Sequence, residues 1–107
     1  HVLVRYAFDR FCEINTPAEH QGRPIRHDID RFRKDLTILA GFYEWSTSIR
    51  GDLVPVALSW SFKSMPDDKD FSRLYQALLN VVVDRICIES TADEVDDIVT
   101  QTILRFA

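Results

Sequence analysis

The sequence has few of the residues that mark a disulfide-stabilised, fibrous or membrane-spanning protein. Of its 107 residues, two are cysteine, three are glycine and four are proline. Two widely spaced cysteines, Cys12 and Cys87, do not make a disulfide framework. The low glycine and proline content excludes a collagen-like chain, and no apolar run approaches the ~18 residues of a membrane span. We expect buried free thiols, a cytoplasmic location and no membrane partner, with one long-range disulfide as the alternative.

The sequence also lacks a strong charge of one sign and any compact catalytic motif. Lys and Arg number 13 and Asp and Glu 17, and the resulting net charge of −4 is not typical of a non-specific nucleic-acid binder. There is no nucleophile elbow, phosphate-binding loop, dinucleotide fingerprint or closely spaced cysteine pair for zinc. We expect no cofactor and no metal. The sequence favours a non-enzymatic protein, and an enzyme with scattered catalytic groups is the alternative.

Enough apolar residues are present for one folded core. Hydrophobic residues make up 46% of the chain, which is too high for a disordered protein. A chain of this length buries about two-thirds of its unfolded surface without needing disulfides. We therefore predict a single globular α+β domain over residues 1–107.

The first part of the chain predicts a strand, a loop and a helix. Apolar side chains alternate over residues 2–8, which favours a strand, and the slip of the pattern at Phe11 indicates a bulge or a break near residues 9–10. Residues 15–24 contain two prolines and a glycine and predict a loop. Apolar residues at helical spacing predict a helix at about 26–40, closed by Gly41 in a left-handed conformation.

A β-hairpin is predicted next. Side chains alternate over residues 43–50 and 54–63, with a short turn around Gly51. Pro55 suits an edge strand or a strand start. One face of this hairpin is expected to be apolar and the other mostly serine and charged. The apolar face would carry Trp45, Val56, Leu58, Trp60 and Phe62.

The last part of the chain predicts two helices with a strand between them. A helix starts after residues 64–68 and ends at about 81, and β-branched residues predict a strand at about 84–89. One unbroken helix to residue 89 is the alternative. Thr91 and Glu94 form a capping box that opens the last helix.

The predicted order is therefore β-α-β-β-α-β followed by a C-terminal helix. That is the order of a ferredoxin-like two-layer sandwich, in which helices cover one face of an antiparallel sheet.

The densest basic run lies within residues 23–34 and raises the question of a nucleic-acid partner. Asp28 and Asp30 interrupt it, and a mixed charge run of this kind is typical of a solvated helix face with ion pairs. The functional alternative is a basic ridge that meets phosphates or an acidic partner. A nucleic-acid-binding domain that uses the basic helix 23–34 is therefore the first alternative function.

Asp9 provides the second alternative. It directly follows the first predicted strand, where an aspartate in some small ferredoxin-like nucleases binds a divalent metal ion. The plainer interpretation is that Asp9 ends the strand. A metal-dependent nuclease or hydrolase centred on Asp9 is the second alternative function.

The favoured function is a small binding or regulatory module that acts through protein–protein contacts. We expect it to self-associate as a homodimer, through the edge strand at 53–63 or through its last helix. Arginine and tryptophan are common at interface hot spots. The candidate contact residues are therefore Arg23, Arg26, Arg31, Arg33 and Trp45.

Overall fold

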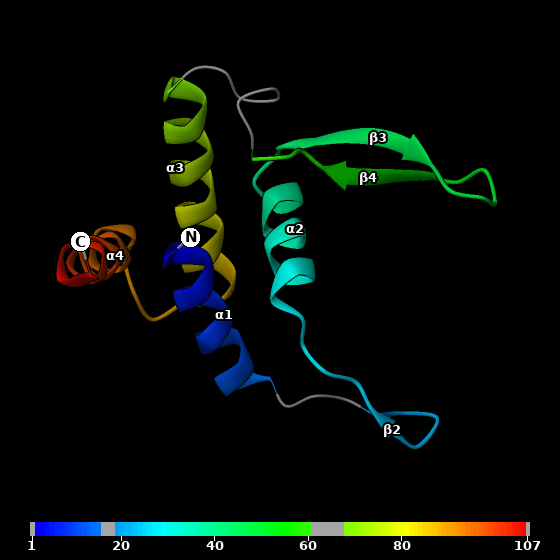
Figure 1. Ribbon diagram of the computed structural model, residues 1–107, viewed down its shortest axis with the longest axis horizontal. Coiled ribbons are helices and arrows are strands. Elements are labelled where there is room, and N and C mark those ends of the chain that lie inside the picture. Colours follow the sequence, from blue (N-terminus) through cyan, green and yellow to red (C-terminus); the bar gives the residue numbers. More distant parts are fainter. Residues whose placement is uncertain (1, 16–18, 61–67, 107) are drawn as a thin grey trace.

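The computed structural model describes residues 2–15, 19–60 and 68–106, which form four helices and two small antiparallel sheets (Figure 1). The elements are α1 (Val2–Ile14), β1 (Glu19–His20), β2 (Arg23–Pro24), α2 (Ile29–Leu39), β3 (Tyr43–Thr47), β4 (Leu53–Ala57), α3 (Asp68–Arg85) and α4 (Ala92–Phe106). The protein is thus of mixed α+β class, as predicted. None of the described helices is both long and apolar enough to cross a membrane.

The ferredoxin-like order is not present in the described residues. The strands form two separate two-stranded sheets, β1–β2 and β3–β4, rather than one sheet covered by helices. Two of the strands that the sandwich requires, at 2–8 and at 84–89, are not strands. The small hairpin β1–β2 lies within the segment predicted as a loop.

The predicted strand at residues 2–8 is wrong, because these residues belong to helix α1. Leu3, Val4 and Ala7 are buried, and Phe8 and Phe11 pack against the core. This spacing of three and four residues defines one face of a helix. A short apolar run fits both the two-residue period of a strand and the helical period, and Phe11, which breaks the strand pattern, fits the helical one. The contacts of α1 with α2 and α4 favour the helix over the strand.

The predicted strand at 84–89 is also wrong, and α3 extends beyond its predicted end at about 81. Val82 lies within α3 and is fully buried, so the β-branched run serves helix packing rather than a sheet. The helix ends at Arg85. The backbone N–H groups of Ile86 and Cys87 both donate to the Val82 carbonyl there, so the regular helical pattern of hydrogen bonds does not continue. The unbroken helix to residue 89 is therefore not formed either.

The predicted glycine after α2 and the predicted capping box of α4 are confirmed, whereas α2 begins at Ile29 rather than at about residue 26. Asp28 caps α2 by accepting the Asp30 N–H at 3.1 Å, and Gly41 after the helix has φ of +93°. At α4 the Thr91 hydroxyl oxygen accepts the Glu94 N–H at 3.2 Å, while the Glu94 carboxylate accepts the Thr91 N–H.

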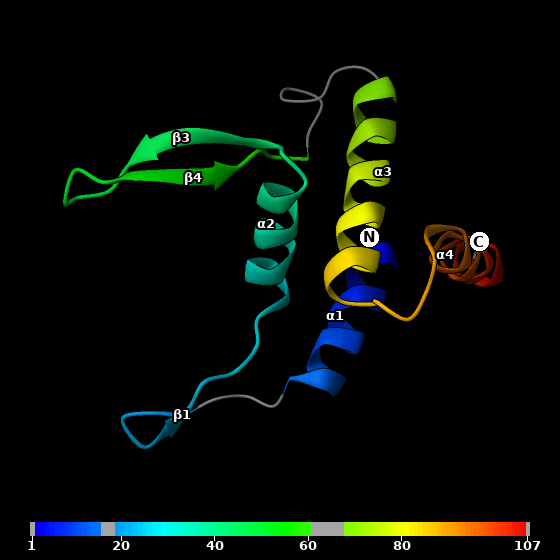
Figure 2. The same ribbon diagram turned by 180° about the vertical axis from the view of Figure 1, so that it is seen from behind.

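The four helices enclose the core. Helix α3 contacts α2 and α4, and α1 contacts the same two helices. Helix α4 runs steeply across α3 (Figures 1 and 2). The buried core draws on every helix and includes Leu3, Val4, Ala7, Phe32, Leu36, Leu74, Leu78, Leu79, Val82, Cys87, Val95 and Val99.

The two cysteines are free, and their surroundings predict different reactivities. Cys87 is buried whereas Cys12 is only half-buried. Burial and the nearby Glu89 carboxylate raise the pKa of the Cys87 thiol, and Arg10 partly opposes this. We expect a disulfide reagent at mildly alkaline pH to modify Cys12 first and Cys87 only when the protein unfolds.

The same pKa shift predicts a pH effect on stability. Above the ordinary thiol pKa the unfolded chain has lost a proton that folded Cys87 still holds. The free energy of unfolding should therefore fall as pH rises through this range, and it should fall less in Cys87→Ala. Urea unfolding of the wild type and of Cys87→Ala at neutral and high pH measures the change in the free energy of unfolding. An equal change in the two proteins would contradict the prediction.

Candidate interaction surface

The register of the β3–β4 hairpin decides which side chains share a face. Trp45 lies opposite Pro55, and Thr47 lies opposite Leu53. A loop over residues 48–52 sets this register. The Ser48 hydroxyl oxygen accepts the N–H groups of Arg50 and Asp52 there, and Gly51 has φ of +86°. The predicted face is therefore wrong at Val56, which lies opposite Glu44 on the other side. Leu58 and Trp60 follow the end of β4, and Phe62 lies outside the described residues.

The face that contains Trp45 is mostly apolar and exposed, with Thr47 as its one polar side chain within β3 and β4. We call Tyr43, Trp45, Leu53 and Pro55 the hairpin apolar face. Trp45 is 62% exposed and Leu53 69% exposed. The rings of Tyr43 and Trp45 contact edge to face, with centroids 5.4 Å apart, so the two side chains hold each other in place. Of these residues the sequence indicated only Trp45 as a contact residue.

The two edges of the hairpin differ. Hydrogen bonds join Leu58 N–H to the Phe42 carbonyl at the base and Ser48 N–H to the Asp52 carbonyl at the turn. Antiparallel pairs alternate between bonded and non-bonded positions. The backbone groups of Tyr43, Trp45 and Thr47 therefore point outward from β3, and among the described residues no further strand pairs there.

On β4 the corresponding outward positions include Pro55, which has no N–H to donate. Strand β4 also lies between β3 and α2 in both ribbon views (Figures 1 and 2). Helix α2 contacts β4, and a hollow lined by Ile38, Leu39, Val54 and Pro55 marks their junction. The β4 edge thus faces the helical body, whereas the β3 edge faces away. This corrects the expectation of an open edge strand over 53–63, of which β4 covers only Leu53–Ala57 and residues 61–63 lie outside the described part of the chain.

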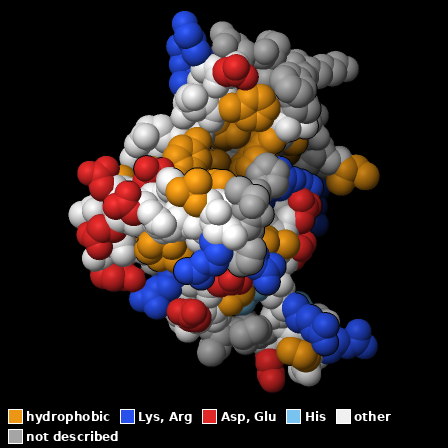
Figure 3. Space-filling view, turned by 60° about the vertical axis from the view of Figure 1, so that its left-hand side comes forward, with side chains coloured by type: hydrophobic (Ala, Val, Ile, Leu, Met, Phe, Trp, Pro, Cys, Tyr) orange, Lys and Arg blue, Asp and Glu red, His pale blue; other side chains and the backbone are white. Residues whose placement is uncertain are grey.

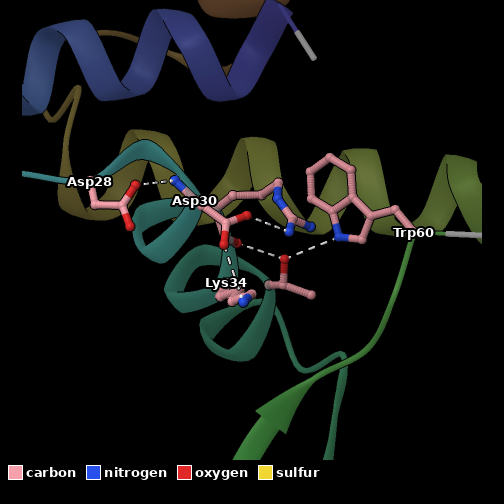
Figure 4. A network of polar contacts seen from close by, with 6 residues as sticks. Asp28, Asp30, Lys34 and Trp60 are labelled. Atoms are coloured by element: carbon pink, nitrogen blue, oxygen red, sulfur yellow. Dashed lines mark hydrogen bonds and ion pairs between the residues drawn. The ribbon is translucent and has the colours of Figure 1, made fainter.

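A polar network anchors the base of the hairpin to α2 (Figure 4). The Trp60 indole N–H donates to the Thr37 hydroxyl oxygen at 3.1 Å, and that hydroxyl donates to the Arg33 carbonyl at 2.7 Å. The Arg33 guanidinium lies 5.3 Å from the centre of the Trp60 ring. The Phe42 N–H donates to the Thr37 carbonyl. These contacts hold the hairpin in a defined position.

Three of the basic residues within 23–34 are paired with carboxylates. Arg31 lies 3.3 Å from Asp35, while Arg33 and Lys34 lie 2.9 and 3.2 Å from Asp30. Hydrogen bonds from Arg33 and Lys34 hold the pKa of Asp30 below its usual value. These pairs agree with the solvated-face interpretation and reduce the cationic surface left for phosphates.

The predicted contact residues do not form one surface. Arg23 lies in β2 and Arg26 precedes α2, and both are exposed. Trp45 lies on β3, at the opposite end of α2 from β2 (Figure 1). Basic side chains on the face in Figure 3 also occur in separate groups interrupted by acidic ones.

Asp9 lies within helix α1 rather than at a strand end, which removes the basis for predicting a metal site there. Its carboxylate is 3.3 Å from the Arg5 guanidinium, one helical turn away. Within the described residues, no group of three or more His, Cys, Asp or Glu side chains is placed to hold a metal ion.

An apolar cavity of about 410 Å³ lies between α1, α3 and α4 beside Trp60. Its described lining includes Leu3, Phe71, Leu78 and Ile103 and carries no charged side chain. Tyr75 also lines it, and its hydroxyl donates to Asp96 at 2.5 Å. Burial and this carboxylate raise the pKa of Tyr75. The described lining thus offers an apolar wall and a phenol that is already bonded.

Comparison with known proteins matches this chain to a protein family. No curated protein and no solved structure matches this chain. A family model described as a protein of unknown function, DUF1367, matches residues 2–106. Because the match spans nearly the whole sequence, the chain belongs to the DUF1367 family.

Proposed function

We propose that this chain is a small non-enzymatic binding module that acts through protein–protein contacts, and that it self-associates through the β3–β4 hairpin. The observation that carries this proposal is the exposure of the hairpin apolar face, above all of Trp45 and Leu53. Large apolar side chains gathered on an exposed face are typical of association surfaces. Tryptophan is among the residues most often found at interface hot spots.

A second copy is the partner that the charges favour. The hairpin apolar face carries no charged side chain, and Glu44 lies on the opposite side of the sheet. Two copies can therefore approach with these faces adjacent and without opposing like charges, although each chain has a net charge of −4. An isolated two-stranded hairpin is also only marginally stable, so pairing would stabilise it.

Light scattering after size exclusion tests the proposal at low and high micromolar protein and at two salt concentrations. We expect a dimer that forms with rising concentration and changes little with salt, because the contact is apolar. The variant Arg23→Ala/Arg26→Ala is the charge control, because both side chains are exposed and neither belongs to the hairpin or its anchor, and it should dimerise like the wild type. A monomer under all conditions, or a dimer lost with salt or in this variant, would refute the proposal.

A further inference from the structure

We infer that the partner of β3 is β3 of a second copy, paired antiparallel at its outer edge. Two hairpins would then form one continuous sheet in the order β4, β3, β3, β4. This inference rests on the proposed self-association and specifies how it occurs. Antiparallel pairing of one strand with its own copy obeys two-fold symmetry, so the contact closes as a dimer.

The backbone selects β3 over β4. Tyr43, Trp45 and Thr47 each present an outward N–H and carbonyl, so the β3 edge has a complete set of donors and acceptors. The edge of β4 has a gap in its donors at Pro55 and faces α2. Natural proteins use proline and covering elements to block sheet edges. Such protection is found on β4, whereas β3 contains no proline and no lysine.

The side chains select the register. A two-fold axis at Trp45 pairs Tyr43 of one copy with Thr47 of the other and pairs the two Trp45 residues with each other. All the outward backbone groups of β3 then have partners. Glu44 lies opposite Ser46 in this register. An axis one residue earlier would place Glu44 opposite Glu44 of the second copy, which is unfavourable for like charges.

This arrangement also explains the composition of the hairpin apolar face. Tyr43 and Trp45 of both copies would lie on the same side of the joined sheet, because paired residues share a face. The two indoles at the axis would be directly opposed, and aromatic cross-strand pairs are favourable. The exposed Trp45 of one chain thus becomes the centre of a contact between two.

The variant Thr47→Pro tests the edge directly. It removes one outward N–H of β3 and leaves the bonds between β3 and β4 intact, as Pro55 does on the other strand. Ala57→Pro is the matched control, because Ala57 is an outward position on the β4 edge. We expect the dimer dissociation constant to rise about tenfold or more for Thr47→Pro and to change little for Ala57→Pro. Circular dichroism establishes that both variants fold.

Amide hydrogen exchange of the wild type supplies a test that needs no substitution. At high protein concentration the amides of Tyr43, Trp45 and Thr47 should exchange much more slowly than at low concentration. The amides of Leu53 and Ala57 should not change. A dimer in which the three β3 amides stay unprotected, or in which both proline variants dimerise equally well, overturns the edge pairing but not the proposed function. A monomer at every concentration overturns both.

Discussion

Replacing Leu36 with alanine is expected to lower the free energy of unfolding by about 3 kcal/mol, within the range of ~2–5 kcal/mol for buried leucines. Leu36 is only 2% exposed and lies on the face of α2 that belongs to the core. Truncation removes buried methyl groups and leaves a cavity that helix packing fills only in part. Because small domains are stable by about 5–15 kcal/mol, this loss is a large fraction of the total.

Leu39→Ala provides the matched control for this prediction. Leu39 lies on the same helix, the chemical change is identical, and its side chain is 50% exposed. We expect a loss below about 1 kcal/mol. Urea unfolding followed by circular dichroism measures both, at a concentration where the protein is monomeric. Equal losses in the two variants would mean that α2 does not pack on the core as described.

Two helix ends were predictable from sequence because they depend on local chemistry. Gly41 and the Thr91–Glu94 capping box act within one turn of chain, and the structure confirms them. The element types at 2–8 and 84–89 were not predictable in this way. Their apolar and β-branched side chains fit a strand locally. The buried positions of Val4 and Val82 show that contacts between helices outweigh that preference.

The candidate site was predictable in part. The alternating pattern placed Trp45 on a hairpin and indicated an edge strand or a strand start at Pro55. It did not give the cross-strand register, which depends on the geometry of the loop at 48–52. Trp45 therefore lies beside Pro55 and Leu53 instead of Val56. The arginines were chosen by residue type alone, and residue type does not show that Arg31 and Arg33 each have a carboxylate partner.

The largest effect on self-association is expected from Trp45→Ser. A symmetric contact loses the Trp45–Trp45 cross-strand pair, worth about 1 kcal/mol, and with it the burial of apolar surface on the two indoles, worth about another 1 kcal/mol. The dimer dissociation constant should therefore rise by roughly 30-fold. Because Trp45 is 62% exposed, the free energy of unfolding of the monomer should change by less than about 1 kcal/mol. Association and folding are thus separable at this position.

Val56→Ser is the control for Trp45→Ser. Val56 is 49% exposed on the other face of the same hairpin, opposite Glu44, so its loss should leave the dissociation constant within about threefold. Sedimentation equilibrium of the two variants gives the comparison. Helix α4 offers the competing surface, because Leu104 is 65% exposed. If Leu104→Ser dissociates the dimer while Trp45→Ser does not, the association belongs to α4 and the hairpin is not its site.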